Sequence, residues 1–262
     1  MASGDHAPRR ARLHQRMESR ARRTRVASIA RAALCVALII APCVAPAAET
    51  QRFTTTAHDL KTGRLAYTET YEVQVDNGRW ISGTTRYFLP DGTSIGERKF
   101  DFSTDRFVPI YTLDQSNVDY HEGLTRIDAQ QVDVFMVRDG HRQTASLTRV
   151  QNMVADCGSQ PYVVEHLDQL EAGVTLHFTL VVAGRTDAFR LRARKLAGVE
   201  VNGRRAMRVR IELDSLLRLF LPPLELTIDP GSKRILEYSG ITNLKDPATR
   251  KAYSAKITFV YK

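Results

Sequence analysis

The chain has 262 residues, of which 43% are hydrophobic, and its 38 Lys and Arg against 29 Asp and Glu give a formal net charge of +9. Nine of the arginines but only two of the acids lie in residues 1–47, so residues 48–262 carry 29 basic and 27 acidic side chains. Because most of the excess positive charge lies in one short segment, the composition argues against a nucleic-acid partner.

The first segment has the organisation of an export signal. Its arginines precede an apolar run from Ala32 to Val44, and the small residues Ala45-Pro46-Ala47 follow. A basic region, an apolar region of about 13 residues and an Ala-x-Ala site predict a cleavable signal peptide, cut after Ala47, and a periplasmic location. An uncleaved anchor, a lipidated cysteine and a twin-arginine signal are weaker alternatives. A start at Met17 instead of Met1 would give the same mature protein.

Cysteine usage indicates a fold that depends on its hydrophobic core. Cys35 and Cys43 belong to the predicted signal peptide, so Cys157 has no partner for an intramolecular disulfide. Cys157 precedes a predicted helix, where the helix dipole can lower a thiol pKa, but no base or orienting group is identifiable. We therefore interpret Cys157 as an ordinary small side chain.

From Gln51 onward, segments that alternate between apolar and polar residues are separated by turn dipeptides about every 8 to 14 residues. The dipeptides are Thr62-Gly63, Asn77-Gly78, Asp91-Gly92, Asp139-Gly140, Asn202-Gly203 and Pro230-Gly231. Asn-Gly and Asp-Gly favour type I′ turns, in which both central residues need positive φ. No linker or repeat divides residues 48–262, so we expect a single β-rich domain. Its predicted fold is mainly β, a single antiparallel curved sheet or half-barrel of roughly 10–14 strands.

One segment departs from the strand pattern. Ser159 is placed to cap a helix, Pro161 lies near the first turn, and apolar residues recur at 163, 167 and 170. Gly173 lies beyond the predicted end. We expect one short helix at about 159–170 that crosses the concave face and buries its apolar stripe on the sheet.

Sequence motifs of known catalytic chemistry are missing. The chain has no Gly-x-Ser-x-Gly, no His-Glu-x-x-His, no paired cysteines and no phosphate-binding glycine loop. The histidines at 58, 121, 141, 166 and 177 lack the spacing of metal ligands within one element. We therefore predict no catalytic residue, no metal site and no cofactor.

Hairpin spacing gives a candidate ligand site. If Asn77-Gly78 and Asp91-Gly92 are two-residue turns, Glu69 lies opposite Arg86 and Arg86 lies opposite Glu97. If this face lines a cavity, the three charges would orient a polar head group above apolar walls. If it faces solvent, they form surface ion pairs of little energetic consequence.

The predicted ligand-binding residues combine these charges with aromatic neighbours and with an apolar segment, Leu216 to Leu224. That segment is either a buried connection or an exposed lip. The candidates are Tyr67, Glu69, Tyr71, Arg86, Phe88, Glu97, Phe220 and Leu221. The opposite face is an alternative concave side and offers Ala66, Thr68, Gly83, Gly96, Phe100 and Phe102.

Basic residues are concentrated in one predicted hairpin that spans positions 190–210. The apolar phase of its first strand shifts, which predicts a bulge between Arg194 and Gly198. Interleaved acids, Glu200 and Glu212, favour a solvated outer face, whereas an unpaired basic surface would suit an acidic membrane surface or an envelope protein. The candidate partner surface is Arg190, Arg192, Arg208 and Arg210.

The order of these elements resembles a broad group of uncharacterised exported bacterial β-rich proteins, whose architecture is similar to the half-barrels of the lipoprotein-localisation carriers. The likeness rests on the export signal, the opening hairpins, the helix with the following Leu170-Glu171-Ala172-Gly173, and a closing hairpin of Leu224 to Asp229 and Arg234 to Tyr238. The resemblance implies a curved sheet with a helix across its hollow, a shape able to hold an acyl chain. It matches no binding motif residue by residue.

Three functions follow, in decreasing order of preference. The first is an exported, non-enzymatic binding or carrier protein of the bacterial envelope, with a lipid or other amphipathic ligand. The second is an envelope scaffold that pairs with another protein through the arginine-rich hairpin or an open sheet edge. The third is a hydrolase of unknown type, which would need a cleft that gathers histidines and carboxylates from separate loops.

Overall fold

The computed structural model describes residues 49–201, 203–216 and 222–261. Within these ranges, 15 strands form one sheet in the order β8-β7-β6-β5-β4-β3-β2-β1-β15-β14-β13-β12-β11-β10-β9. The pair β9–β10 is parallel, and the other neighbouring pairs are antiparallel. The sheet is not closed, because β8 and β9 form its two edges. The predicted fold class is confirmed, with one strand more than the upper end of the predicted range.

The strands cover most of the described chain. They are β1 (Glu49–Asp59), β2 (Leu65–Asp76), β3 (Arg79–Phe88), β4 (Ser94–Asp101), β5 (Ile110–Gln115), β6 (Tyr120–Ile127), β7 (Gln131–Arg138), β8 (His141–Thr148), β9 (Met153–Ala155), β10 (Leu176–Val182), β11 (Asp187–Val201), β12 (Arg204–Leu213), β13 (Leu224–Asp229), β14 (Arg234–Lys245) and β15 (Ala252–Tyr261). Three 3₁₀ turns in the described ranges are η1 (Ser116–Val118), η2 (Asp156–Gly158) and η3 (Ala183–Arg185).

Alternation of side chains along the strands builds the core, as β2 illustrates. Tyr67, Tyr71 and Val73 are buried on one face, whereas Thr70 and Glu72 between them are exposed. Side chains two apart share a face of a strand, so this pattern turns one face of β2 toward the protein interior. The burial of β2 confirms the predicted one-sided strand.

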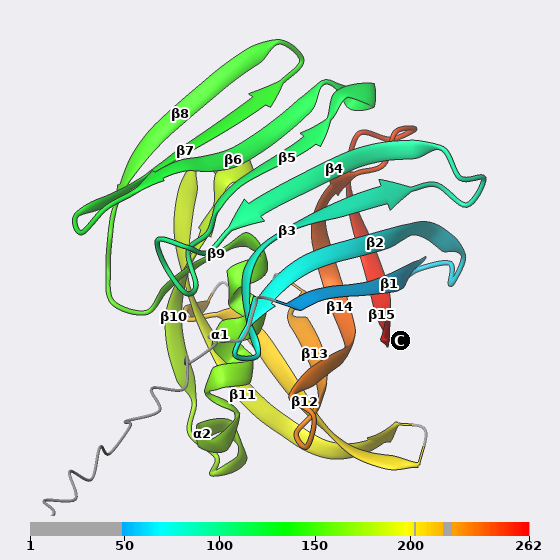
Figure 1. Ribbon diagram of the computed structural model, residues 1–262, viewed down its shortest axis with the longest axis vertical. Helices are drawn as coiled ribbons and strands as arrows, with labels where there is room; N and C mark the ends of the chain where they lie inside the picture. Colours follow the sequence, from blue (N-terminus) through cyan, green and yellow to red (C-terminus); the bar gives the residue numbers. More distant parts are fainter. Residues whose placement is uncertain (1–48, 202, 217–221, 262) are drawn as a thin grey trace, which may run out of the picture. The chain divides into compact units, whose positions relative to one another are not determined.

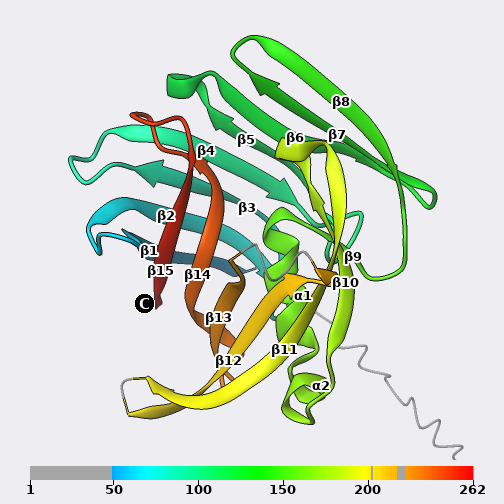
Figure 2. The same cartoon turned by 180° about the vertical axis from the view of Figure 1, so that it is seen from behind.

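The sheet is strongly curved, and α1 and α2 lie on its concave side (Figures 1 and 2). Curvature brings the turn η3 against β6 and β7, although β10 and β6 lie far apart in the strand order. Gly184 in η3 leaves no room for a side chain, since a Cβ there would overlap the carboxylate of Glu122 and the hydroxyl of Tyr120. Contacts of η3 with β6 and β7 therefore stabilise the fold across its interior, in addition to the pairing between neighbouring strands.

The predicted helix is present as two consecutive short helices, α1 (Ser159–Glu165) and α2 (Leu167–Glu171). Val163, Leu167 and Leu170 are buried, as expected from their spacing. Gly173, with φ of 85°, ends the segment, and the N–H of residue 174 donates to the carbonyl of residue 169 at 2.9 Å, which is the Schellman arrangement.

The predicted cap at the start of this helix is wrong. Ser159 makes no capping hydrogen bond, because its hydroxyl donates to the carbonyl oxygen of Asp156 at 3.0 Å. The turn η2 precedes α1 directly and already bends the chain into the helix.

No helix in the described ranges is long and apolar enough to cross a membrane. The predicted signal peptide, residues 1–47, lies outside the described residues, so export and cleavage after Ala47 stay predictions.

Candidate ligand-binding site

The predicted ladder of Glu69, Arg86 and Glu97 forms only in part. Arg86 lies opposite Glu97, as expected. Glu69 lies opposite Tyr87 instead of Arg86, because the pairing of β2 with β3 skips Ile81: Val75 pairs with Trp80, whereas Gln74 pairs with Ser82. One extra residue in the hairpin moves every later pair and changes which face a side chain occupies. Glu69 stays on the buried face of β2 with Tyr67 and Tyr71. The shift instead turns Arg86 outward, where it forms a surface ion pair of 3.0 Å with Glu97, and the two side chains are 51% and 33% exposed.

The other residues of the predicted ligand site lie in different places. Tyr67 and Tyr71 are buried beside Glu69, whereas Phe88 is half-buried. Phe220 and Leu221 lie outside the described residues. On β3 and β4, the alternative face lines the interior, since its residue Phe100 is buried. The predicted set therefore does not form one site.

The carboxylate of Glu69 belongs to a buried hydrogen-bond network. The hydroxyls of Thr55 and Tyr71 each donate to its Oε2 at 2.7 Å. Burial raises the pKa of Glu69 above its ordinary value, although both hydrogen bonds act in the opposite direction. The network places this carboxylate in the interior of the sheet, away from the two pockets described below.

An ion pair between Arg98 and Asp156 lies in the interior of the protein. The Arg98 Nη1 lies 3.1 Å from an oxygen of Asp156, and the two side chains are only 12% and 3% exposed. Asn243 Nδ2 donates to Asp156 at 2.8 Å, and Arg98 Nη2 donates to the hydroxyl of Thr85 at 3.3 Å. Asp156 opens η2, so these contacts fix the start of the helical segment to β4 and β14.

A pocket that we call the mouth pocket has a volume of about 710 Å³. It lies between the ends of strands, the loop after β4, the β13–β14 turn and α1. Its lining residues are Gln51, Phe53, Gly78, Arg79, Trp80, Ile81, Phe102, Arg106, Phe107, Gln160, Pro161, Val164, Glu165, Ser232, Lys233, Arg234, Ile235 and Tyr261. A volume of this size is within the range of small-molecule sites.

Aromatic rings form the walls of the mouth pocket. The Phe53 ring lies 6.0 Å from that of Trp80 and 5.1 Å from that of Tyr261, measured between centroids. These residues come from β1, β3 and β15, which are adjacent or near neighbours in the sheet. Their packing gives the pocket an apolar surface that can bury a hydrocarbon chain.

The lining of the mouth pocket also carries an excess of positive charge. Four cationic side chains line it, namely Arg79, Arg106, Lys233 and Arg234. Glu165 is the single acid of this lining and is paired with Arg106. The guanidinium of Arg234 also lies over the Tyr261 ring, 4.8 Å from its centroid. Arg79, Lys233 and Arg234 thus leave net positive charge beside apolar walls, which suits a ligand that is both apolar and anionic.

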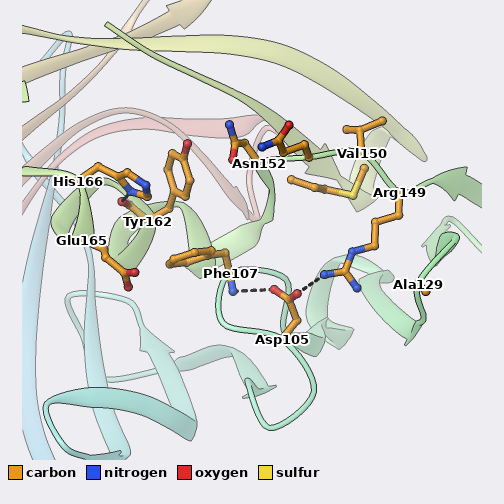
Figure 3. A pocket seen from close by; sticks show the side chains of 11 residues that line it. Asp105, Phe107, Ala129, Arg149, Val150, Asn152, Tyr162, Glu165 and His166 are labelled. Carbon is orange, nitrogen blue, oxygen red and sulfur yellow. Dashed lines mark hydrogen bonds and ion pairs between the residues drawn. The ribbon is translucent and has the colours of Figure 1, made fainter. Parts of the chain in front are cut away.

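The second pocket, which we call the flanking pocket, has a volume of about 460 Å³. Its lining residues are Asp105, Phe107, Ala129, Arg149, Val150, Gln151, Asn152, Met153, Tyr162, Glu165 and His166 (Figure 3). Figure 3 shows Phe107, Tyr162 and His166 on one side and the paired Asp105 and Arg149 on the other.

The helix α1 lies between the two pockets, and different sides of it line each one. Residues 160, 161 and 164 line the mouth pocket, whereas residues 162, 165 and 166 line the flanking pocket. Positions three and four apart share one face of a helix, so each set forms a stripe. Phe107 and Glu165 line both pockets and form the wall between them.

Backbone contacts hold this wall in place. The backbone N–H groups of Phe107 and Val108 each donate to Asp105 Oδ1 at 2.8 Å. The carbonyl oxygen of Phe107 accepts the N–H of Ala155 at 2.9 Å. The same oxygen packs against Gly158, where a Cβ would overlap it. Gly158 is thus required for the close approach of the loop to η2.

Replacing Gly158 with Ala is expected to lower the free energy of unfolding by about 1–3 kcal/mol, because the wall must shift to admit a methyl group. The matched control is Gly198→Ala, since no heavy atom lies within 4 Å of a Cβ at that position. Urea denaturation of both variants measures the difference. Equal stability of the two variants would show that the loop yields without cost.

The arginine-rich hairpin is largely compensated by acids. Arg192 Nε donates to Glu212 at 2.9 Å, and Arg210 Nη2 donates to Glu225 at 2.8 Å. Although partial burial acts in the opposite direction, the hydrogen bond and the charge of Arg192 hold the pKa of Glu212 below its ordinary value. The predicted bulge is confirmed, between Lys195 and Gly198.

The remaining two arginines of the predicted partner surface have weaker partners. Arg208 lies 3.9 Å from Glu225, and Arg190, which is 80% exposed, lies 4.0 Å from Asp214. The pairing favours the solvated outer face that the interleaved acids predict. An acidic membrane surface or envelope protein as a partner stays a prediction.

Neither metal ligation nor thiol chemistry is indicated by the described side chains. Among them, no group of three or more His, Cys, Asp or Glu residues is placed to hold a metal ion. Cys157 is buried, and burial raises the pKa of its thiol well above the ordinary value. A thiol with a raised pKa is a poor nucleophile, so Cys157 fits the interpretation as a packing residue.

The residues that line the two pockets were mostly missed by sequence reasoning.

No protein-family model matches the sequence, and no curated protein matches it. Among solved structures, the chain is similar to the crystal structure of a beta-barrel-like protein of the domain of unknown function DUF1849 from Brucella abortus. The identity is 10%, the TM-score is 0.39, and the match covers 83% of this chain and 98% of that chain. A similarity this low gives no information on the function of this chain or on its site residues.

Proposed function

We propose that this chain is an exported, non-enzymatic binding or carrier protein of the bacterial envelope, and that its ligand is an amphipathic molecule with an anionic head group. The observation that carries the proposal is the lining of the mouth pocket, in which aromatic walls lie beside Arg79, Lys233 and Arg234, cations without an ion pair to any acid that the structure describes. An apolar chain in the pocket gains about 0.8 kcal/mol per buried methylene. The cations then select the charge of the head group and fix its position.

The test is isothermal titration with dodecanoate below its micellar concentration, together with dodecanol as an uncharged ligand of the same chain length. Dodecanoate is expected to bind, and the double variant Arg79→Gln/Arg234→Gln is expected to weaken it about tenfold, as for the loss of a charged interaction. The same variant is expected to leave the affinity for dodecanol unchanged.

The matched control is Arg64→Gln, because Arg64 is exposed and lines neither pocket. It is expected to bind dodecanoate like the unmodified protein. Absence of any dodecanoate binding would overturn the proposed function. If Arg64→Gln lowered the affinity for dodecanoate as much as Arg79→Gln/Arg234→Gln does, the effect would instead come from the net charge of the protein.

A further inference from the structure

The charged residues of the flanking pocket are compensated within the protein. Arg149 is paired with Asp105, and its Nη1 also donates to the carbonyl oxygen of Asp128 at 3.0 Å. Asp105 accepts two backbone N–H groups in addition. Glu165 is paired with Arg106 from the mouth side of the wall. The flanking pocket therefore offers no free charge to a ligand, in contrast to the mouth pocket.

Neutral polar groups make up the rest of its hydrogen-bonding surface. They are the amides of Gln151 and Asn152, the hydroxyl of Tyr162 and the imidazole of His166. His166 Nδ1 lies 2.8 Å from the carbonyl oxygen of Tyr162. A carbonyl oxygen only accepts, so Nδ1 carries a hydrogen, and Nε2 is the ring nitrogen left for a ligand. The pocket thus presents both hydrogen-bond donors and acceptors.

Three rings pack together at one side of the pocket (Figure 3). The Tyr162 ring lies 5.2 Å from that of Phe107, edge to face, and 4.4 Å from that of His166. Tyr162 is buried among these rings, so the half-buried Phe107 and His166 present the ring surfaces that suit the C–H faces of a pyranose, while the polar groups suit its hydroxyl groups. An anionic or cationic group would find no opposite free charge in this pocket.

We propose that the flanking pocket binds a neutral polyhydroxyl group, and that the ligand is an acidic glycolipid. Its apolar chain and acidic group then lie at the mouth pocket, and its sugar lies across the wall of Phe107 and Glu165. This inference rests on the proposed function, because it assigns the second part of the same ligand. The observation behind it is that Phe107 and Glu165 line both pockets, so the two parts of one ligand would lie on either side of these two side chains.

The test compares two probes with the same chain, dodecyl glucoside and dodecanoate, both below their micellar concentrations. The double variant Gln151→Leu/Tyr162→Phe removes two neutral hydrogen-bonding groups and is expected to weaken dodecyl glucoside about tenfold. Dodecanoate is expected to bind this variant as well as it binds the unmodified protein. The mouth-pocket variant Arg79→Gln/Arg234→Gln is expected to weaken the binding of dodecanoate and to leave the binding of dodecyl glucoside unchanged.

The control is Gln143→Leu, which removes an exposed amide from β8, outside the lining of either pocket. If dodecanoate binds but dodecyl glucoside does not, or if the double variant leaves glucoside binding unchanged, the glycolipid inference is overturned and the proposed function stands. If neither probe binds the unmodified protein, the proposed function itself fails. Should the double variant not fold, Tyr162→Phe alone removes only a hydroxyl and is expected to weaken glucoside about threefold.

Discussion

Replacing Asp156 with Asn is expected to lower the free energy of unfolding by about 3–5 kcal/mol, because it leaves the buried guanidinium of Arg98 without an opposite charge. Asn has nearly the same shape as Asp, and its oxygen can still accept the hydrogen bond from Asn243. Asn also tolerates the left-handed backbone at this position, where φ is 43°. The substitution therefore isolates the loss of charge.

The surface pair of Arg86 and Glu97 supplies the control for this experiment. Glu97→Gln removes the charge from a pair of similar length that is largely solvated, so we expect a loss of about 0–1 kcal/mol. Chemical denaturation of both variants gives the comparison. Equal losses would contradict the view that the ion pair of Arg98 and Asp156 fastens the helical segment to the sheet.

A second large effect is expected at Glu122, which lies buried on β6. Tyr111 donates to its carboxylate at 3.2 Å, and Tyr120 donates to the other oxygen. Burial raises the pKa of Glu122 to about 7, and the negative charge of Asp156 acts in the same direction. The tyrosine hydrogen bonds and the positive charge of Lys245 act against this shift but do not cancel it.

A carboxyl whose pKa is raised by folding favours the folded state only while it is protonated. Its contribution is fully present below the unfolded pKa of 4.5 and is lost as the pH rises through about 7. For a shift of this size, the loss is about 3 kcal/mol. The free energy of unfolding of the unmodified protein is therefore expected to fall between these two pH values.

Glu122→Gln is expected to remove this part of the pH dependence, since the amide does not titrate. Denaturation of both proteins at a series of pH values from 4 to 8 checks the expectation. The difference between the two stability profiles isolates Glu122, because the raised pKa of Glu69 affects both proteins equally. Parallel profiles would mean that Glu122 does not change its protonation on unfolding in this range.

Local patterns in the sequence were enough to predict the strands and the helical segment. Tyr67, Tyr71 and Val73 alternate with polar residues, and such a strand has one buried face wherever it pairs. Gly173 marks the end of the helical segment because only glycine adopts its left-handed backbone at little cost. These signals depend on neighbours within one turn or one strand, so they are legible without the tertiary structure.

The pairing between strands could not be predicted to the same degree. Arg86 lies opposite Glu97 as predicted, but not through a two-residue Asp91-Gly92 turn: Phe88 pairs with Ser94, and an irregularity at residues 87–88 restores the predicted register. In the preceding hairpin, one extra residue of β3, Ile81, shifted the register, so that Tyr87 took the inward position opposite Glu69 and Arg86 moved to the outer face. A bulge is set by how the side chains on both strands pack against the rest of the core, and a turn dipeptide does not report it.

The candidate site was the least predictable part of the molecule. Phe53, Trp80 and Tyr261 approach one another only because β1 pairs with both β2 and β15, the latter from the far end of the chain. The wall of Phe107 depends on Gly158, about fifty positions later in the sequence. The sequence did carry one usable signal, the periodicity of the helix at 159–170, whose outer stripes line the pockets.

The most direct test of the proposed function is quenching of Trp80 fluorescence by dodecanoate that carries bromine on its terminal carbon. Trp80 is the single tryptophan of the chain and lines the mouth pocket, so contact quenching reports only a chain that enters this pocket. We expect saturable quenching that unbrominated dodecanoate displaces, and a shift to higher ligand concentration in Arg79→Gln/Arg234→Gln. Trp80 fluorescence that stays unchanged while titration calorimetry detects binding would place the ligand elsewhere and contradict the assignment of the mouth pocket.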